Sequence, residues 1–216
     1  MKPFSHYNYS CLRPALRTGD AIFFEGKGLI SDLICLVAGG PSHVALVERT
    51  DDRIRLVEST SQRIGAKWII GVQRTYLSDR LRDYDGHVWW APLKNEYSVK
   101  VVGHSNKFFA YLDMLHGKRY DFWQVMRKGW QLLNLPRVFP VRESPRRLFC
   151  SELAALAYKH MGVLPESINA STVSPRELAS FNLYVAAHQL AGPKSKDLPV
   201  LNTKEVKHES REYRED

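Results

Sequence analysis

The sequence predicts an α+β fold in which an antiparallel sheet packs against helices. Two patterns support this prediction. Short apolar segments between turn residues predict strands at 21–26, 42–48, 53–59, 87–92 and 181–187. Apolar residues at helical spacing predict helices at 105–116, 122–133 and 150–161, and the mixed apolar spacing of 29–38 favours a helix over a strand. The chain has 216 residues, which is enough to bury one sizeable core.

Turn signals separate the strand segments. Glycine and proline at 39–41 interrupt the chain before the segment 42–48. The four residues 49–52 join this segment to 53–59, which predicts a β-hairpin.

The helix segments combine an apolar face with an end signal. In 105–116, Phe108, Leu112 and Leu115 share one face, and Gly117 follows. Further signals are an apolar stripe in 122–133, Gly162 after 150–161, and the capping box Ser174–Glu177 with Pro175 in its first turn.

By composition the chain divides into three parts. Residues 1–15 form an N-terminal arm, and residues 16–192 contain the predicted strands and helices. Residues 193–216 are polar and charged, which predicts a disordered tail.

The net charge of +8 belongs to the body of the chain, because Lys and Arg balance Asp and Glu in residues 193–216. A basic body attracts anionic partners such as cell-wall polymer, phospholipid head groups or nucleic acid. General solubility is the alternative explanation of the charge.

Localisation signals are missing from the sequence. The most apolar stretch, 21–38, contains Glu25, Lys27 and Asp32, so it does not read as a membrane span. The first residues contain no apolar signal-peptide core. We therefore expect synthesis to end in the cytoplasm, with later delivery out of the cell still open.

Three cysteines, Cys11, Cys35 and Cys150, form no CxxC pair, which suggests neither a disulfide framework nor a zinc knuckle. Cys11 and Cys35 are interpreted as packing or incidental thiols. Cys150 opens a helix whose buried stripe also contains Leu153 and Ala154. At a helix N-terminus, the dipole and unpaired N–H groups favour a thiolate and can bind an oxyanion. The alternative is that Cys150 only packs the helix onto the sheet.

His43 and Glu58 supply a base and its partner. If residues 49–52 are the hairpin loop, Glu48 pairs with Arg53 and His43 lies directly opposite Glu58. Opposed side chains share a face with Cβ atoms about 5 Å apart, so the carboxylate can accept the imidazole N–H. A slip of one residue would separate the two side chains. With this register, Glu58 orients His43, which activates Cys150.

Five short motifs in order resemble the circularly permuted branch of the NlpC-type papain-like superfamily, with YiiX-like members nearest and lecithin:retinol acyltransferase-like proteins more distant. They are GDAIFF at 19–24, SHVALV at 42–47, LVEST at 56–60, GKRYDF at 117–122 and FCSELAALAY at 149–158. The resemblance spans roughly residues 16–185. In this branch the sheet with its histidine precedes the helix with its cysteine, as His43 precedes Cys150.

The resemblance implies a permuted papain-like fold with Cys150 as nucleophile, His43 as base and Glu58 as third member. It also implies that Tyr120 helps to bind the oxyanion, although a buried structural tyrosine would give the same match. Relatives in the acyltransferase branch place a second histidine near the first, where this chain has Ala45. This departure favours the peptidase- or amidase-like branch.

The remaining motifs give weaker indications. His104 and His116 are far apart on their helix and no HExxH motif occurs, so we expect no metal and no other cofactor. Basic and aromatic residues alternate in 127–147, just before Cys150. This segment is interpreted as a wall or lid of the cleft in contact with substrate or membrane, with a solvated face or a nucleic-acid surface as alternatives.

We therefore expect a cysteine hydrolase that cleaves an amide or ester bond without a cofactor. Candidate substrates are peptidoglycan fragments, lipids with acyl groups, and peptides. The competing expectation is a catalytically silent module that holds an anionic ligand in a basic cleft. The oligomeric state has no signal in the sequence.

Overall fold

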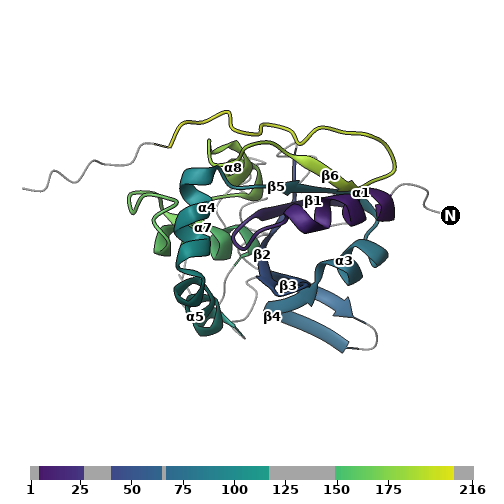
Figure 1. Cartoon of the computed structure of the whole chain (residues 1–216), viewed down its shortest axis with the longest axis horizontal. Coiled ribbons are helices and arrows are strands. Elements are labelled where there is room, and N and C mark those ends of the chain that lie inside the picture. Colours follow the sequence, from purple (N-terminus) through teal and green to yellow (C-terminus); the bar gives the residue numbers. More distant parts are fainter. Residues whose placement is uncertain (1–4, 27–39, 65–66, 117–148, 207–216) are drawn as a thin grey trace, which may run out of the picture.

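The computed structural model describes residues 5–26, 40–64, 67–116 and 149–206, which are drawn in colour in Figure 1. The predicted helices at 29–38 and 122–133, Cys35 and Tyr120 lie outside the described residues.

One six-stranded antiparallel sheet forms the centre of the fold, in the order β4-β3-β2-β1-β5-β6. Its strands are β1 Ala21–Gly26, β2 His43–Thr50, β3 Arg53–Ile64, β4 Lys67–Tyr76, β5 Gly86–Ala91 and β6 His188–Ala191. The predicted α+β class and antiparallel sheet are confirmed.

Helices lie on both sides of the sheet (Figure 1). They are α1 Ser5–Leu12, α3 Leu77–Asp83, α4 Asn95–Gly103, α5 Ser105–Leu115, α7 Cys150–His160 and α8 Pro175–Ser180, with short 3-10 turns at Arg13–Ala15 and Ala170–Thr172. Among the described residues, none of these helices has the length and apolar character needed to cross a membrane.

The sheet is apolar on both faces. One face packs Phe23 and Val44 against α4, α5 and α7, and the other packs Phe24 and Ala45 against α3. Residues Ala21–Phe24 are therefore all buried. Covering both faces explains why β1 reads as a continuous apolar run rather than as an alternating one.

Several predicted elements are confirmed within one or two residues. They are β1, β5, α5 and α7, together with the start of α8, where the Ser174 side chain accepts a hydrogen bond from the Glu177 N–H at 3.1 Å. The Glu177 carboxylate lies 3.2 Å from Lys204 Nζ.

The last strand was placed too early by the sequence pattern. Residues 181–187 form no strand; Phe181 and Tyr184 make only isolated bridges, and β6 begins at His188. The apolar pattern of this segment arises because Phe181 and Tyr184 pack into the core on the helical side of the sheet. It does not reflect the alternation of a strand.

The chain beyond Pro193 lies against the body as far as Val206, although its composition predicts a disordered tail. The indole Nε1 of Trp89 donates to the carbonyl of Lys196 at 2.7 Å, and the Asn202 amide donates to the carbonyl of Tyr184 at 2.6 Å. These hydrogen bonds and the burial of Leu198 in the core together hold a polar segment in place.

Asp20 joins the turn before β1 to β5 and the residues that follow it. One carboxylate oxygen accepts the Arg17 N–H and the Trp90 indole N–H, both at 2.8 Å, and the other accepts the Leu93 N–H at 3.0 Å. Burial raises the pKa of Asp20 to about 6, since these donors offset only part of the desolvation cost.

We expect Asp20→Ala to lower the free energy of unfolding by about 3 kcal/mol, because it leaves two buried N–H donors, those of Trp90 and Leu93, without an acceptor. The raised pKa adds a pH signature. The part of this contribution that depends on protonation is present below the ordinary pKa of Asp20 and is lost as pH rises through about 6, whereas the hydrogen bonds to Trp90 and Leu93 remain. Urea unfolding at several pH values measures both effects. Equal stability of the wild type and the variant at all pH values would contradict this role, and exposed Asp79→Ala is the control.

Candidate active site

Cys150 is the first residue of α7 and is 6% exposed. The stripe expected on this helix is buried as a whole, and it consists of Cys150, Leu153, Ala154, Ala157 and Met161. The helix is fastened at its start by Glu152, whose carboxylate accepts the Phe149 N–H at 3.3 Å. The thiol thus sits at the positive end of the α7 dipole.

Two backbone N–H groups donate to the Cys150 sulfur, those of Ser151 and Val44. The first follows from the helix start. The second comes from β2, whose pairing with β3 ends at the Leu46–Val57 pair. Val44 precedes Leu46 in β2, so its N–H is not paired with β3 and instead hydrogen-bonds to the Cys150 thiol.

His43 is the first residue of β2 and stands between Cys150 and Glu58. Its Nε2 lies 2.7 Å from Glu58 Oε2, and its ring also makes a hydrogen bond with the Cys150 thiol. Because Nε2 faces the carboxylate, Nδ1 is the nitrogen left for the thiol. The ring packs against Phe24, with the ring centroids 5.4 Å apart.

The hairpin register that led to this pair is wrong by two residues. The loop is Asp51 and Asp52 alone, Thr50 pairs with Arg53, and Glu48 pairs with Arg55 instead of Arg53. Asp51 has φ of 49°, which a short polar residue tolerates in a tight turn.

The expected contact survives this error because side chains alternate with period two along a strand. Shifting the register by two residues keeps His43 and Glu58 on one face, although the two are not directly opposite. Continued past its last pair, the observed register would bring Glu58 beside Ala45. The hydrogen bond to His43 is therefore made diagonally across the two strands.

Glu58 is fully buried and accepts four hydrogen bonds. Oε2 receives His43 Nε2 at 2.7 Å and Arg80 Nη2 at 3.0 Å. Oε1 receives the Thr75 hydroxyl and Arg80 Nε, both at 2.9 Å. Gln73 is the directly opposite residue in β4.

The charges of these groups support one another. Burial alone would lower the pKa of His43, but the charge and hydrogen bond of Cys150, and then those of Glu58, raise it to about 9. Burial would raise the pKa of the Cys150 thiol, but the charge and hydrogen bond of His43 lower it. Each charge therefore favours the ionised form of the other group.

Glu58 remains ionised in the same site. Burial opposes its ionisation, yet the charge of Arg80 and the hydrogen bond and charge of His43 lower the pKa of Glu58 to about 2. The arrangement can thus supply a nucleophile, a proton carrier and a fixed negative charge.

The structure brings together Cys150, His43 and Glu58, while Tyr120 and the basic segment 127–147 lie outside the described residues. The sequence interpretation missed three groups at the site, namely the Val44 N–H, Thr75 and Arg80. Thr75 and Arg80 lie in β4 and α3, elements that were not predicted.

Comparisons with known proteins show a distant structural likeness. No protein-family model matches the chain, and no curated protein matches it. The chain is similar to the crystal structure of the metalloprotein YiiX from Escherichia coli O157:H7, of the DUF1105 family. The identity is 19%, the TM-score is 0.45, and the match covers 67% of this chain and 66% of that one. The match thus spans just under two thirds of that protein.

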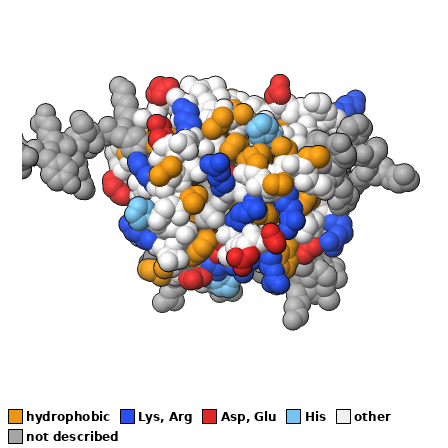
Figure 2. All heavy atoms as spheres, in the orientation of Figure 1, with side chains coloured by type: hydrophobic (Ala, Val, Ile, Leu, Met, Phe, Trp, Pro, Cys, Tyr) orange, Lys and Arg blue, Asp and Glu red, His pale blue; other side chains and the backbone are white. Residues whose placement is uncertain are grey.

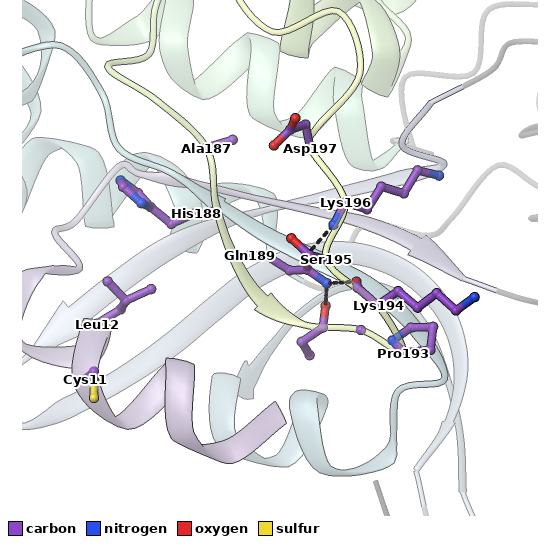
Figure 3. A pocket seen from close by; sticks show the side chains of 12 residues that line it. Cys11, Leu12, Ala187, His188, Gln189, Pro193, Lys194, Ser195, Lys196 and Asp197 are labelled. Carbon is purple, nitrogen blue, oxygen red and sulfur yellow. Dashed lines mark hydrogen bonds between the residues drawn. The ribbon is translucent and has the colours of Figure 1, made fainter. Parts of the chain in front are cut away.

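The described part of the chain offers no group of three or more His, Cys, Asp or Glu side chains suited to a metal ion. A pocket of about 670 Å³ lies between α1, β6 and residues 192–197 (Figure 3). The Gln189 amide ties its wall together by donating to the carbonyls of Ala191 and Lys194 at 3.2 and 2.7 Å. This pocket is separated from β2 by β1 and β5 and contains none of the candidate catalytic residues.

Glu58 should make stability depend on pH. Its folded pKa of about 2 lies below its ordinary value of 4.5, so its stabilising contribution is present above pH 4.5 and is lost as pH falls toward 2. The shift corresponds to about 3 kcal/mol. We expect the difference in unfolding free energy between wild type and Glu58→Gln to shrink by this amount from about pH 6 to about pH 2.

Urea unfolding followed by tryptophan fluorescence measures this difference. Glu166→Gln, which removes an exposed carboxylate, is the matched control. A wild-type advantage that stays constant across the pH range would show that the buried carboxylate is not held ionised.

Proposed function

We propose that this chain is a cysteine hydrolase that cleaves an amide or ester bond through an acyl-enzyme on Cys150. The observation that carries the proposal is the connected set of contacts from the Cys150 thiol through the His43 ring to the buried Glu58 carboxylate. A cysteine that only packs a helix onto a sheet needs no imidazole at its sulfur and no ionised carboxylate behind that imidazole.

The first half of the reaction forms the acyl-enzyme. The Cys150 thiolate attacks the substrate carbonyl carbon, and the carbonyl π electrons move to oxygen. As the tetrahedral intermediate collapses, protonated His43 gives its proton to the leaving amine or alcohol. Glu58 keeps the ring oriented and balances its positive charge.

The second half releases the product. His43, now neutral, takes a proton from water, and the resulting hydroxide attacks the thioester carbon. Collapse of the second tetrahedral intermediate breaks the carbon–sulfur bond and restores the thiolate beside imidazolium. The proton lent to the leaving group is thus replaced from water.

Backbone donors are available for the oxyanion. The Ser151 N–H belongs to the helix start, and the Val44 N–H is outside the β2–β3 ladder. Both lower the pKa of the Cys150 thiol and so lie beside the nucleophile, where fixed donors stabilise developing negative charge without reorganising. Tyr120 remains a proposed additional donor.

The proposal includes a permuted papain-like fold. It is supported by the order of the elements, since the strand bearing His43 precedes the helix that begins at Cys150, and by that helix packing on the sheet. Ala45 is buried on the Glu58 side of β2, so no second histidine stands there. This favours hydrolysis of amides over acyl transfer.

Peptidoglycan peptides, acyl lipids and peptides are the proposed substrate classes. On the face shown in Figure 2, Lys and Arg side chains lie interspersed with Asp and Glu rather than in one continuous field. This face therefore carries mixed charge. The alternative, a silent module that binds an anionic ligand, is an outcome of the tests below.

Reactivity of the thiol is the first test. We expect iodoacetamide near neutral pH to alkylate Cys150 at least about 10-fold faster than exposed Cys11, because His43 lowers the pKa of the Cys150 thiol. His43→Ala should abolish the difference. Peptide mapping by mass spectrometry over time reads both rates, with Cys11 as the internal reference.

Equal and slow alkylation of Cys11 and Cys150 would contradict the proposed enzyme activity and favour the silent binding module. Fast alkylation of Cys150 that persists in His43→Ala would show that burial and the helix N-terminus, not the histidine, activate the thiol.

Turnover is the second test. Wild-type protein incubated with peptidoglycan fragments, peptides and acyl esters should release product from one class, and Cys150→Ala should reduce the rate by at least about 1000-fold. Trapping with hydroxylamine should yield a hydroxamate of the acyl group. Equal rates for the two proteins would place the activity elsewhere.

A further inference from the structure

Arg80 reaches from α3 to the far side of Glu58. Its Nε donates to Oε1 at 2.9 Å and its Nη2 donates to Oε2 at 3.0 Å, so the guanidinium grips both carboxylate oxygens. The Arg80 side chain is only 10% exposed. A two-pronged pair of this kind fixes the plane of the carboxylate as well as its position.

Aromatic rings hold the guanidinium from its other sides. The central carbon of Arg80 lies 5.1 Å from the ring centroid of Phe24 and 5.6 Å from that of Tyr84. Phe24 also packs against the His43 ring. One aromatic side chain therefore contacts both the base and the cation behind its partner.

We propose that Arg80 is a positioning residue of the active site, which acts on His43 through Glu58. The inference rests on the proposed function, because it assigns a role in the same site. Oε1 is occupied by Thr75 and Arg80 Nε, so the carboxylate cannot turn, and Oε2 stays directed at the His43 ring.

Arg80 also supplies a permanent countercharge for the buried Glu58 carboxylate. During the proposed cycle His43 gives up its proton and regains it, whereas Glu58 is buried throughout. Without a second cation, the carboxylate would face a neutral imidazole for part of each cycle with no countercharge. Arg80 supplies a cation that does not titrate, so Glu58 keeps its charge and its hydrogen bond while His43 changes state.

The groups that face Glu58 come from three elements. They are His43 from β2, Gln73 and Thr75 from β4, and Arg80 from α3, with Cys150 of α7 acting through His43. Of these, Gln73 and Thr75 are uncharged, and His43 and the Cys150 thiol beside it are the groups that titrate. Removal of Arg80 therefore changes the only fixed cation among these contacts.

The test uses four variants and a control in the full chain. Arg80→Gln removes the cation, Arg80→Lys keeps the charge without the fork, Glu58→Gln removes the carboxylate, and a double variant combines Arg80→Gln with Glu58→Gln. Arg82→Gln is the matched control, since Arg82 lies on the same helix but is 62% exposed and pairs with Asp79.

The first readout is NMR of labelled Glu carboxyl carbons and His ring nitrogens. In the wild type we expect Glu58 to stay ionised from about pH 7 to about pH 4, and in Arg80→Gln we expect it to titrate inside that window. The His43 ring signals should change at the same midpoint. Arg80→Lys should keep Glu58 ionised but shift the His43 signals, and Arg82→Gln should match the wild type.

The second readout is the alkylation rate of Cys150 near neutral pH. Arg80→Gln should slow it by about 10-fold or more, and the double variant should be no slower than Glu58→Gln alone, because Arg80 acts only through that carboxylate. A purely structural arginine would instead give rate losses that add in the double variant, or would leave the rate unchanged.

The positioning role is overturned if Glu58 stays ionised down to about pH 4 in Arg80→Gln and the His43 signals do not move. If Arg80→Gln does not fold, as judged by circular dichroism, Arg80→Lys alone decides through the His43 signals and the alkylation rate. Failure of the proposed function looks different. Cys150 would then be unreactive in the wild type, while the NMR titration would still decide whether Arg80 controls Glu58.

Discussion

The buried negative charge of Glu58 is the feature on which the rest of the site depends. Removing a carboxylate from water costs several kcal/mol unless partners of opposite charge and hydrogen-bond donors surround it. Here the donors come from β2, β4 and α3, so these elements must be docked for the charge to be tolerated. The same contacts that make the burial possible also orient His43 toward Cys150, which joins the stability of this corner to its chemistry.

A second constraint is the early end of the β2–β3 ladder. A continued ladder would engage the backbone of Val44 in strand pairing. Because pairing stops at Leu46 and Val57, the Val44 N–H instead meets the Cys150 sulfur, beside the donor from Ser151. The site thus stands where the sheet leaves backbone groups unpaired, and the N-terminus of α7 supplies the complementary partner. The end of β2–β3 pairing and the docking of α7 therefore build the site together.

The sequence carried strong signals for part of this arrangement and weak ones for the rest. Cys150 opens a helix with a clear apolar stripe, and His43 and Glu58 lie in two apolar strand segments, so their elements were predictable. The loop length was wrong, yet the face was right, because only the parity of the register decides it. Arg80 was missed because α3 reads LSDRLRD, in which Leu77 and Leu81 alone are apolar. The pairing of Arg80 with Glu58 can be recognised only after β3, β4 and α3 have been placed together in the fold.

Two buried carboxylates show how the surroundings separate a structural role from a chemical one. Asp20 and Glu58 both accept several hydrogen bonds, yet the pKa of Asp20 is raised to about 6 and that of Glu58 is lowered to about 2. Asp20 meets mainly N–H dipoles, which offset burial only in part, and the charge of Arg17 adds least. Glu58 meets the full charge of Arg80 and the ring of His43. A hydrogen-bonded carboxylate can therefore hold strands together, but ionic partners are required to keep one charged beside a base that must change its protonation state.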